Sequence, residues 1–199
     1  MGFVSALPAS LPVAVFVVMH TPSSAPGLLP RILARHATMP VASAEGGEPV
    51  VPGRILVAPP DFHLLLEPSG VRLSRGPREN RQRPAVDPLF RSAALAFGPA
   101  VIGVVLSGTL DDGTGGLLAV KAHGGLAVVQ EPSEALFAGM PVNALATGVV
   151  DHRLRVAEIG RLIAERALVA SEGSLILEAP ALPGPAKQDE ELEMAITKK

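Results

Sequence analysis

The sequence predicts an α/β fold, a three-layer α/β/α arrangement built around a mostly parallel sheet. Short apolar runs rich in β-branched residues alternate along the chain with segments whose apolar residues recur at helical spacing. This alternation is typical of βαβ units. The chain has 199 residues, of which 48% are hydrophobic and 18% charged, so we expect one domain with a substantial core.

The first part of the chain supplies two strands, a helix and a hairpin. Residues 13–19 form a continuous apolar run that suits a strand buried on both faces, and a helix is expected over residues 25–36. Residues 53–60 predict a second buried strand, which ends at prolines. The segment 63–75 places a Pro-Ser-Gly turn between two apolar runs, which indicates a β-hairpin.

The second part continues the alternation of helices and strands. A helix over residues 87–98 is predicted to begin with Asp87 as its N-cap and Pro88 at its first helical position, and to end at Gly98. The elements expected after it are a strand over 101–106, a helix over 114–123, a strand over 125–132 and a last helix over 155–168.

The expected domain occupies residues 1–171, and residues 172–199 are predicted to be a disordered tail because they mix prolines with dense charge. The apolar stretch near the N-terminus has no basic residues before it and is interrupted by Pro8 and Pro12. It therefore predicts a buried strand rather than a secretory signal or a membrane span, and we expect no insertion into a membrane.

Composition excludes several classes of function. The formal net charge is −2 with no basic block, and there is no tryptophan or tyrosine, which argues against a nucleic-acid partner. The chain has no cysteine, which excludes disulfides, thiolate catalysis and cysteine metal sites, and fits a reducing compartment. No cofactor is expected.

Polar residues that could carry chemistry follow two of the predicted strands. The run "VAVFVVMH" ends at His20, and "VIGVVLSGTLDDGTGG" presents Asp111 and Asp112. In parallel α/β sheets ligands bind beyond the carboxyl ends of the strands, and a histidine beside an aspartate supplies two members of a hydrolytic triad. Gly113 and the two glycines after it would let backbone N–H groups approach a developing oxyanion.

Simpler roles stay open for the same residues. His20 could be structural, either aspartate could only cap the next helix, and a glycine-rich turn can bind phosphate at a helix N-terminus. The turn matches neither of the common nucleotide-binding glycine motifs. Paired aspartates could also hold Mg²⁺, although no third carboxylate lies at an obvious strand end. The other histidines are expected on surface helices or loops: His36, His63, His123 and His152.

A local basic cluster lies in "SRGPRENRQRPAVDPLF", with Arg75, Arg78, Arg81 and Arg83. It is either a solvated loop or a rim that recognises a carboxylate-rich partner, because arginine forks suit carboxylates.

In collinear order from about Leu7 to Leu168, five stretches resemble the catalytic domain of the bacterial chemotaxis protein-glutamate methylesterase: "VVMHTP", "VPGRILVAPPDFHLLLE", "RPAVDPLFRSAA", "GVVLSGTLDDGTGGLLAVKAHGG" and "VVQEPSEALFAGMPVNAL". The resemblance implies a cytoplasmic three-layer α/β hydrolase that removes methyl groups from glutamyl esters on methyl-accepting receptors and often deamidates receptor glutamines. It implies that His20 and Asp112, rather than Asp111, are catalytic. Arg81, Arg83 and Gly113 are candidate contacts to substrate or partner.

The chain departs from the family at the nucleophile. The family serine stands in a "G-A-S-x-G-G" turn after a first strand, whereas Met1–Leu7 corresponds to the later part of the helix that follows this turn. Ser5, Ser10 and Ser107 do not occupy the family position, and no G-x-S-x-G elbow occurs elsewhere. We expect a start codon placed too late, with a degenerate gene as the second explanation.

Two other functions stay open. One is a non-catalytic module of the same family that binds receptors or signalling partners. The other is an unrelated phosphate- or nucleotide-binding α/β domain that uses the loop at 112–116.

Overall fold

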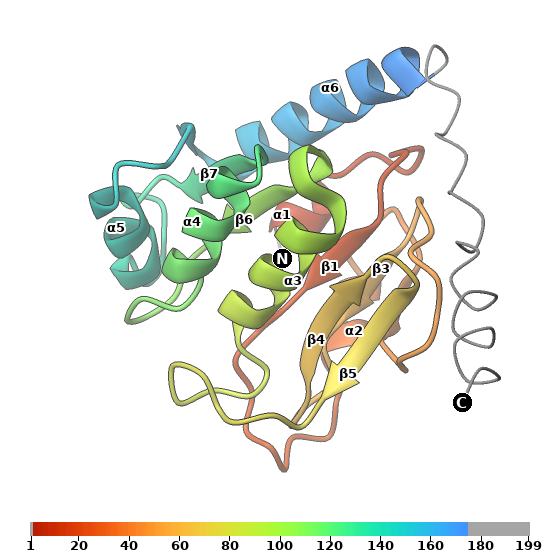
Figure 1. Cartoon of the computed structure of the whole chain (residues 1–199), viewed down its shortest axis with the longest axis vertical. Helices are drawn as coiled ribbons and strands as arrows, with labels where there is room; N and C mark the ends of the chain where they lie inside the picture. Colours follow the sequence, from red (N-terminus) through yellow and green to blue (C-terminus); the bar gives the residue numbers. More distant parts are fainter. Residues whose placement is uncertain (1, 175–199) are drawn as a thin grey trace, which may run out of the picture.

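Within residues 2–174 the strands form two parallel sheets and one hairpin. The computed structural model describes residues 2–174 (Figure 1). The first sheet has the spatial order β1 (Val15–Val17), β3 (Ile55–Val57) and β2 (Val41–Ser43), and the second has the order β6 (Ile102–Val105), β7 (Leu126–Gln130) and β8 (His152–Leu154). Strands β4 (His63–Glu67) and β5 (Gly70–Ser74) pair antiparallel as a separate hairpin.

Helices and the hairpin cover both faces of these sheets. Successive side chains of a strand point to opposite faces, and β7 shows this directly. Ala127 and Val129 belong to one buried apolar cluster, whereas Val128 belongs to the other. The first cluster packs under α3 (Val86–Phe97), α4 (Thr114–Ala122), α5 (Gly139–Ala146) and the hairpin; the second packs under α1 (Gly2–Ser5), α2 (Leu29–Ala34) and α6 (Val156–Ser174).

Every strand and helix expected from the pattern is present, with ends shifted by a few residues. The expectations missed α1, β2, α5 and β8, and they end α6 too early. The two missed strands have only three residues each, too few for an apolar period to stand out. No helix in residues 2–174 is both long and apolar enough to cross a membrane.

Three local expectations are wrong. His152 is half-buried in β8 and does not lie on a surface helix or loop. His63 is not on the surface, because it lies buried in β4, where its Nε2 donates to the Pro77 carbonyl at 2.9 Å. Asp87 is not the N-cap of α3, since the helix begins one residue earlier at Val86 and Ala85 occupies the cap position. Gly98 does end the helix, with a φ of 50°.

The predicted tail is helical where it begins, because α6 continues to Ser174. The rest of that prediction, residues 175–199, lies outside the described residues.

The two parallel sheets do not join into one. Among the described strands, β1 pairs only with β3, and β6 pairs only with β7. In a parallel sheet each strand offers backbone N–H and C=O groups on both edges. One edge of β1 and one edge of β6 therefore lack a strand partner in the part of the chain that the structure describes.

Candidate active site

The structure brings His20 and Asp112 together at the carboxyl ends of the two sheets. His20 follows β1, and Asp112 lies in the loop between β6 and α4. The imidazole Nε2 is 2.5 Å from Oδ2 of Asp112. Asp112 is 1% exposed, whereas the His20 side chain is 27% exposed and open to a ligand. Asp111, its sequence neighbour, is exposed.

Backbone and side-chain donors surround the Asp112 carboxylate. Oδ2 also accepts the Val86 N–H at 2.7 Å, and Oδ1 accepts the Asp87 N–H at 3.1 Å and the Asn80 amide at 2.8 Å. Burial by itself raises the pKa of Asp112, but the bond to His20 and those from the other donors lower it further than burial raises it. The pKa therefore lies below its ordinary value, and Asp112 is ionised at neutral pH.

An ionised carboxylate can only accept hydrogen bonds, so the Nε2 of His20 carries the proton in this contact. The neutral imidazole then has its lone pair on Nδ1. No hydrogen-bond partner of Nδ1 is found among residues 2–174. The pair has the arrangement of a general base held by an orienting carboxylate, with Nδ1 open to a nucleophile's proton.

A second buried carboxylate, Asp87, lies beside the pair. Its Oδ1 accepts the backbone N–H of Gly113 at 3.0 Å and of Gly116 at 2.6 Å, at the N-terminus of α4. Asp112 in turn accepts two N–H groups at the N-terminus of α3, so each aspartate caps the other's helix. Burial is the main cause that raises the pKa of Asp87 above its ordinary value.

Because each aspartate caps the other's helix, two expected roles of the glycine-rich turn change: that of oxyanion donor and that of phosphate site. The amides of Gly113 and Gly116 already bind Asp87, so they do not face a substrate as oxyanion donors in this structure. The same carboxylate occupies the N-terminus of α4, where a phosphate would have to bind.

The basic cluster is divided between internal and exposed arginines. The Arg83 guanidinium donates to Oδ1 of Asp61 from Nε at 3.0 Å and from Nη2 at 2.6 Å, and to the carbonyl of Gly76. This contact lowers the pKa of Asp61. Arg83 therefore fixes a loop and is not free for a partner. Arg81 is exposed, with a φ of 65°.

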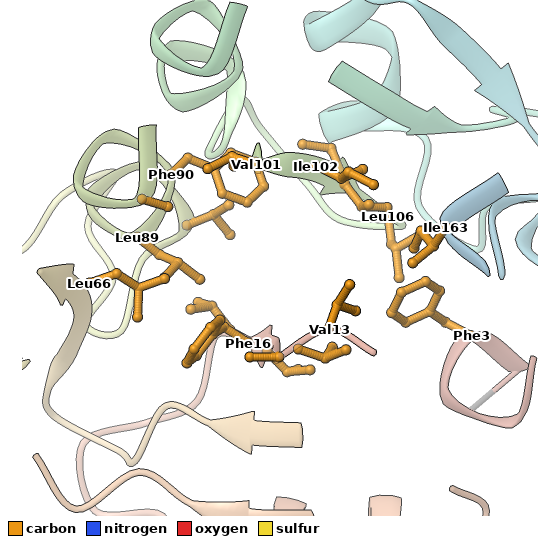
Figure 2. Close-up of a pocket in the computed structure, with 18 of the residues that line it drawn as sticks. Phe3, Val13, Phe16, Leu66, Leu89, Phe90, Val101, Ile102, Leu106 and Ile163 are labelled. Carbon is orange, nitrogen blue, oxygen red and sulfur yellow. The ribbon is translucent and has the colours of Figure 1, made fainter. Parts of the chain in front are cut away.

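An apolar cavity of about 400 Å³ lies between β1 and β6. Figure 2 shows side chains around it that come from strands of both sheets and from helices, among them Phe16, Ile102, Leu106, Phe90 and Ile163. Of the described residues that line it, Ser107 alone has a polar side chain. The cavity separates the two unpaired strand edges.

Sequence reasoning missed Asn80 as a site residue and gave Asp87 a different role. Asn80 lies in the loop before α3, and its amide touches both buried carboxylates. The only signal in the sequence was an asparagine within the arginine cluster, and the separation of 32 positions between Asn80 and Asp112 hides the contact.

Comparison with known proteins gives a consistent result. The sequence model of the family described as CheB methylesterase matches residues 1–163. The crystal structure of the CheB methylesterase catalytic domain from Thermotoga maritima is similar, with a TM-score of 0.80 and 31% sequence identity. The match covers 83% of this chain and 89% of that one. This likeness confirms the predicted fold class.

Curated relatives agree. A protein-glutamate methylesterase/protein-glutamine glutaminase of Anaeromyxobacter dehalogenans is 41% identical over 169 residues, which cover 81% of this chain and 47% of the relative. A putative protein of the same name from Leptospira interrogans is 37% identical over 157 residues, covering 78% of this chain and 81% of the relative. The chain spans about half the length of the first curated relatives it matches.

Proposed function

Because the chain belongs to the CheB methylesterase family, we propose that it serves the hydrolysis of glutamyl methyl esters on methyl-accepting chemotaxis receptors. The names of its relatives add the deamidation of glutamines to the proposal. The observation that supports it most directly is the 2.5 Å contact between His20 and the buried Asp112. His20 and Asp112 are the proposed catalytic residues.

The proposed chemistry needs a serine hydroxyl beside Nδ1 of His20. Nδ1 takes the hydroxyl proton as the oxygen attacks the ester carbonyl, and Asp112 stabilises the imidazolium that forms. The imidazolium then gives the proton to the departing methoxide, which leaves as methanol. A water, deprotonated by His20 in the same way, attacks the glutamyl–serine ester, and the imidazolium returns the proton to the departing serine oxygen, which releases glutamate and the free serine.

We place the nucleophile on a strand that runs between β1 and β6, as the family resemblance implies. Such a strand could pair with both open edges and would fill the apolar cavity. If it ran parallel to them, its carboxyl end would lie at the same edge of the sheet as His20. Ser107 is a poor substitute because it does not occupy the family position and no hydrogen bond joins it to His20 in the described residues; its Oγ accepts the Phe137 N–H at 2.9 Å.

The proposed partner is the cytoplasmic helical region of a methyl-accepting receptor, and the proposed location is the cytoplasm. The exposed Arg81 is the proposed contact for an acidic surface of the receptor. Neither nucleic acid nor direct insertion into a membrane is part of this proposal.

The experiment measures methanol released from methylated receptor membranes by the purified chain. It is repeated with an added peptide that has an apolar strand followed by the G-A-S-x-G-G motif. The control peptide has alanine in place of the serine. We expect release only with the serine peptide and loss of that release in His20→Gln.

Three results would overturn the proposal. Release by the chain alone that persists in His20→Gln would place the chemistry elsewhere. No release with either peptide, together with direct binding of the receptor, would favour the non-catalytic binding module. If phosphate compounds raise the melting temperature while esters stay intact, the phosphate-binding alternative gains support.

A further inference from the structure

Asn80 lies in the loop between β5 and α3 and has a φ of 49°, in the left-handed region that asparagine tolerates better than most residues. The turn formed by Asn80 and Arg81 is closed on both sides, because the backbones of Glu79 and Gln82 exchange hydrogen bonds at 3.1 and 2.8 Å. The loop therefore presents the Asn80 side chain in one direction, toward the interior.

The Asn80 amide bridges the two buried carboxylates. Its Nδ2 donates to Oδ2 of Asp87 at 2.9 Å and to Oδ1 of Asp112 at 2.8 Å, which uses both of its hydrogens. Two buried carboxylates repel each other when both are ionised, and burial raises the pKa of Asp87. A neutral group with two donors relieves this repulsion and cannot itself ionise.

The bridge fixes which oxygen of Asp112 faces the histidine. Oδ1 is bound by Asn80 and by the Asp87 N–H, whereas Oδ2 is bound by the Val86 N–H and His20. Rotation of the carboxylate about its Cβ–Cγ bond would break contacts on both oxygens. With Oδ1 held, Oδ2 stays aimed at Nε2 of His20.

We propose that Asn80 is a positioning residue for the His20–Asp112 pair: it holds the Asp112 carboxylate in the rotamer that fixes the His20 tautomer. The same bridge couples this pair to Asp87 and to the N-termini of α3 and α4. The inference deepens the proposed function and rests on it for its catalytic meaning, but its test needs neither a substrate nor a nucleophile.

The test compares Asn80→Gly with Arg81→Gly by nuclear magnetic resonance of the full chain. Glycine suits the left-handed backbone at both positions, so each variant removes a side chain without adding strain. Arg81 is the matched control because it is exposed and has no hydrogen bond to either carboxylate. The measurements are the His20 Nε2–H resonance, the ratio of the two His20 tautomers, and the exchange of the Val86 and Asp87 amides.

In Asn80→Gly we expect loss of the slowly exchanging Nε2–H resonance and a mixture of tautomers. Exchange of the two amides should rise by about tenfold or more, since a hydrogen bond to a charged group is removed next to them. Arg81→Gly should match the wild type. An unchanged resonance and tautomer ratio in Asn80→Gly would overturn the proposal, and so would an equal effect in both variants.

A measurement on the unmodified chain covers the case in which Asn80→Gly fails to fold. Both Asn80 side-chain amide protons should exchange slowly and should shift as pH is lowered through the titration of Asp87. An Asn80 amide that exchanges as fast as an exposed asparagine would overturn the proposal. The methanol assay is independent of these readouts, so failure of the proposed function is distinguishable from failure of this one.

Discussion

The carboxyl edge of the sheets is polar and hydrogen-bonded, whereas the space between β1 and β6 is apolar and partly empty. At the edge, His20, Asn80, Asp87 and Asp112 are buried or half-buried polar groups bound to each other or to helix N-termini. Between the sheets, side chains line an apolar cavity, and two strand edges have no strand partner in the described residues (Figure 2).

The difference follows from how each region finds its partners. Loops deliver His20, Asn80 and Asp112 to the carboxyl edge, and α3 delivers Asp87. The two carboxylates and the asparagine amide are satisfied by side chains or by the first N–H groups of a helix. A strand edge that faces an apolar cavity can be satisfied in full only by another strand, which must run the length of the cavity. The buried carboxylates of the carboxyl edge therefore have their partners although no strand lies in the cavity, whereas Nδ1 of His20 has none in residues 2–174.

The largest expected effect is the loss of unfolding free energy when the hydrogen bonds of Asp112 at the carboxyl edge are removed. Asp112→Ala leaves four donors without their acceptor, among them the Val86 and Asp87 amides. Removing one partner of such a buried network costs about 3–5 kcal/mol. Urea unfolding measures the loss, with the exposed neighbour as control: Asp111→Ala should cost about 0.5 kcal/mol or less. Equal losses at the two positions would show that the hydrogen bonds of Asp112 do not stabilise the fold.

A smaller loss of unfolding free energy is expected at the apolar cavity between β1 and β6. Val104 and Val128 are opposite each other in neighbouring strands, but Val104 lines the cavity and Val128 is fully buried. Val128→Ala should cost about 2 kcal/mol in unfolding free energy, because it opens a void in packed surroundings. Val104→Ala should cost about 1 kcal/mol or less, since part of its surface already faces empty space. Similar costs at the two positions would show that the cavity is closed in solution and would contradict the contrast.

The smallest expected effect is the change of unfolding free energy with pH that Asp87 causes at the carboxyl edge. The pKa of Asp87 is raised above its ordinary value of 3.8, so its ionised form costs stability at neutral pH. Lowering pH from neutral through the raised pKa toward 3.8 should stabilise the wild type relative to Asp87→Asn, by at most about 1.4 kcal/mol per pH unit.

Asp112 contributes with the opposite sign. Its pKa is lowered, so its contribution is present above 3.8 and is lost as pH falls through its folded value. Chemical denaturation at several pH values separates the two aspartates. A difference between wild type and Asp87→Asn that does not change with pH would contradict the raised pKa.

The sequence by itself determined the layers and the edge at which the candidate site lies. Apolar runs of strand length alternate with helical patterns, and this fixes which segments pack together. Because parallel strands place their carboxyl ends on one side, residues that follow two such strands meet there. His20 and Asp112 could be paired in advance on that ground and on the family resemblance.

Only the tertiary structure decided how the polar groups are shared. Asp111 and Asp112 are adjacent in the chain, yet one is exposed and the other buried. Arg83 binds Asp61 inside the loop region, and Asn80 reaches a carboxylate 32 residues away. Such contacts depend on loop conformations and on the docking of helix ends, which have no period for a sequence pattern to reveal.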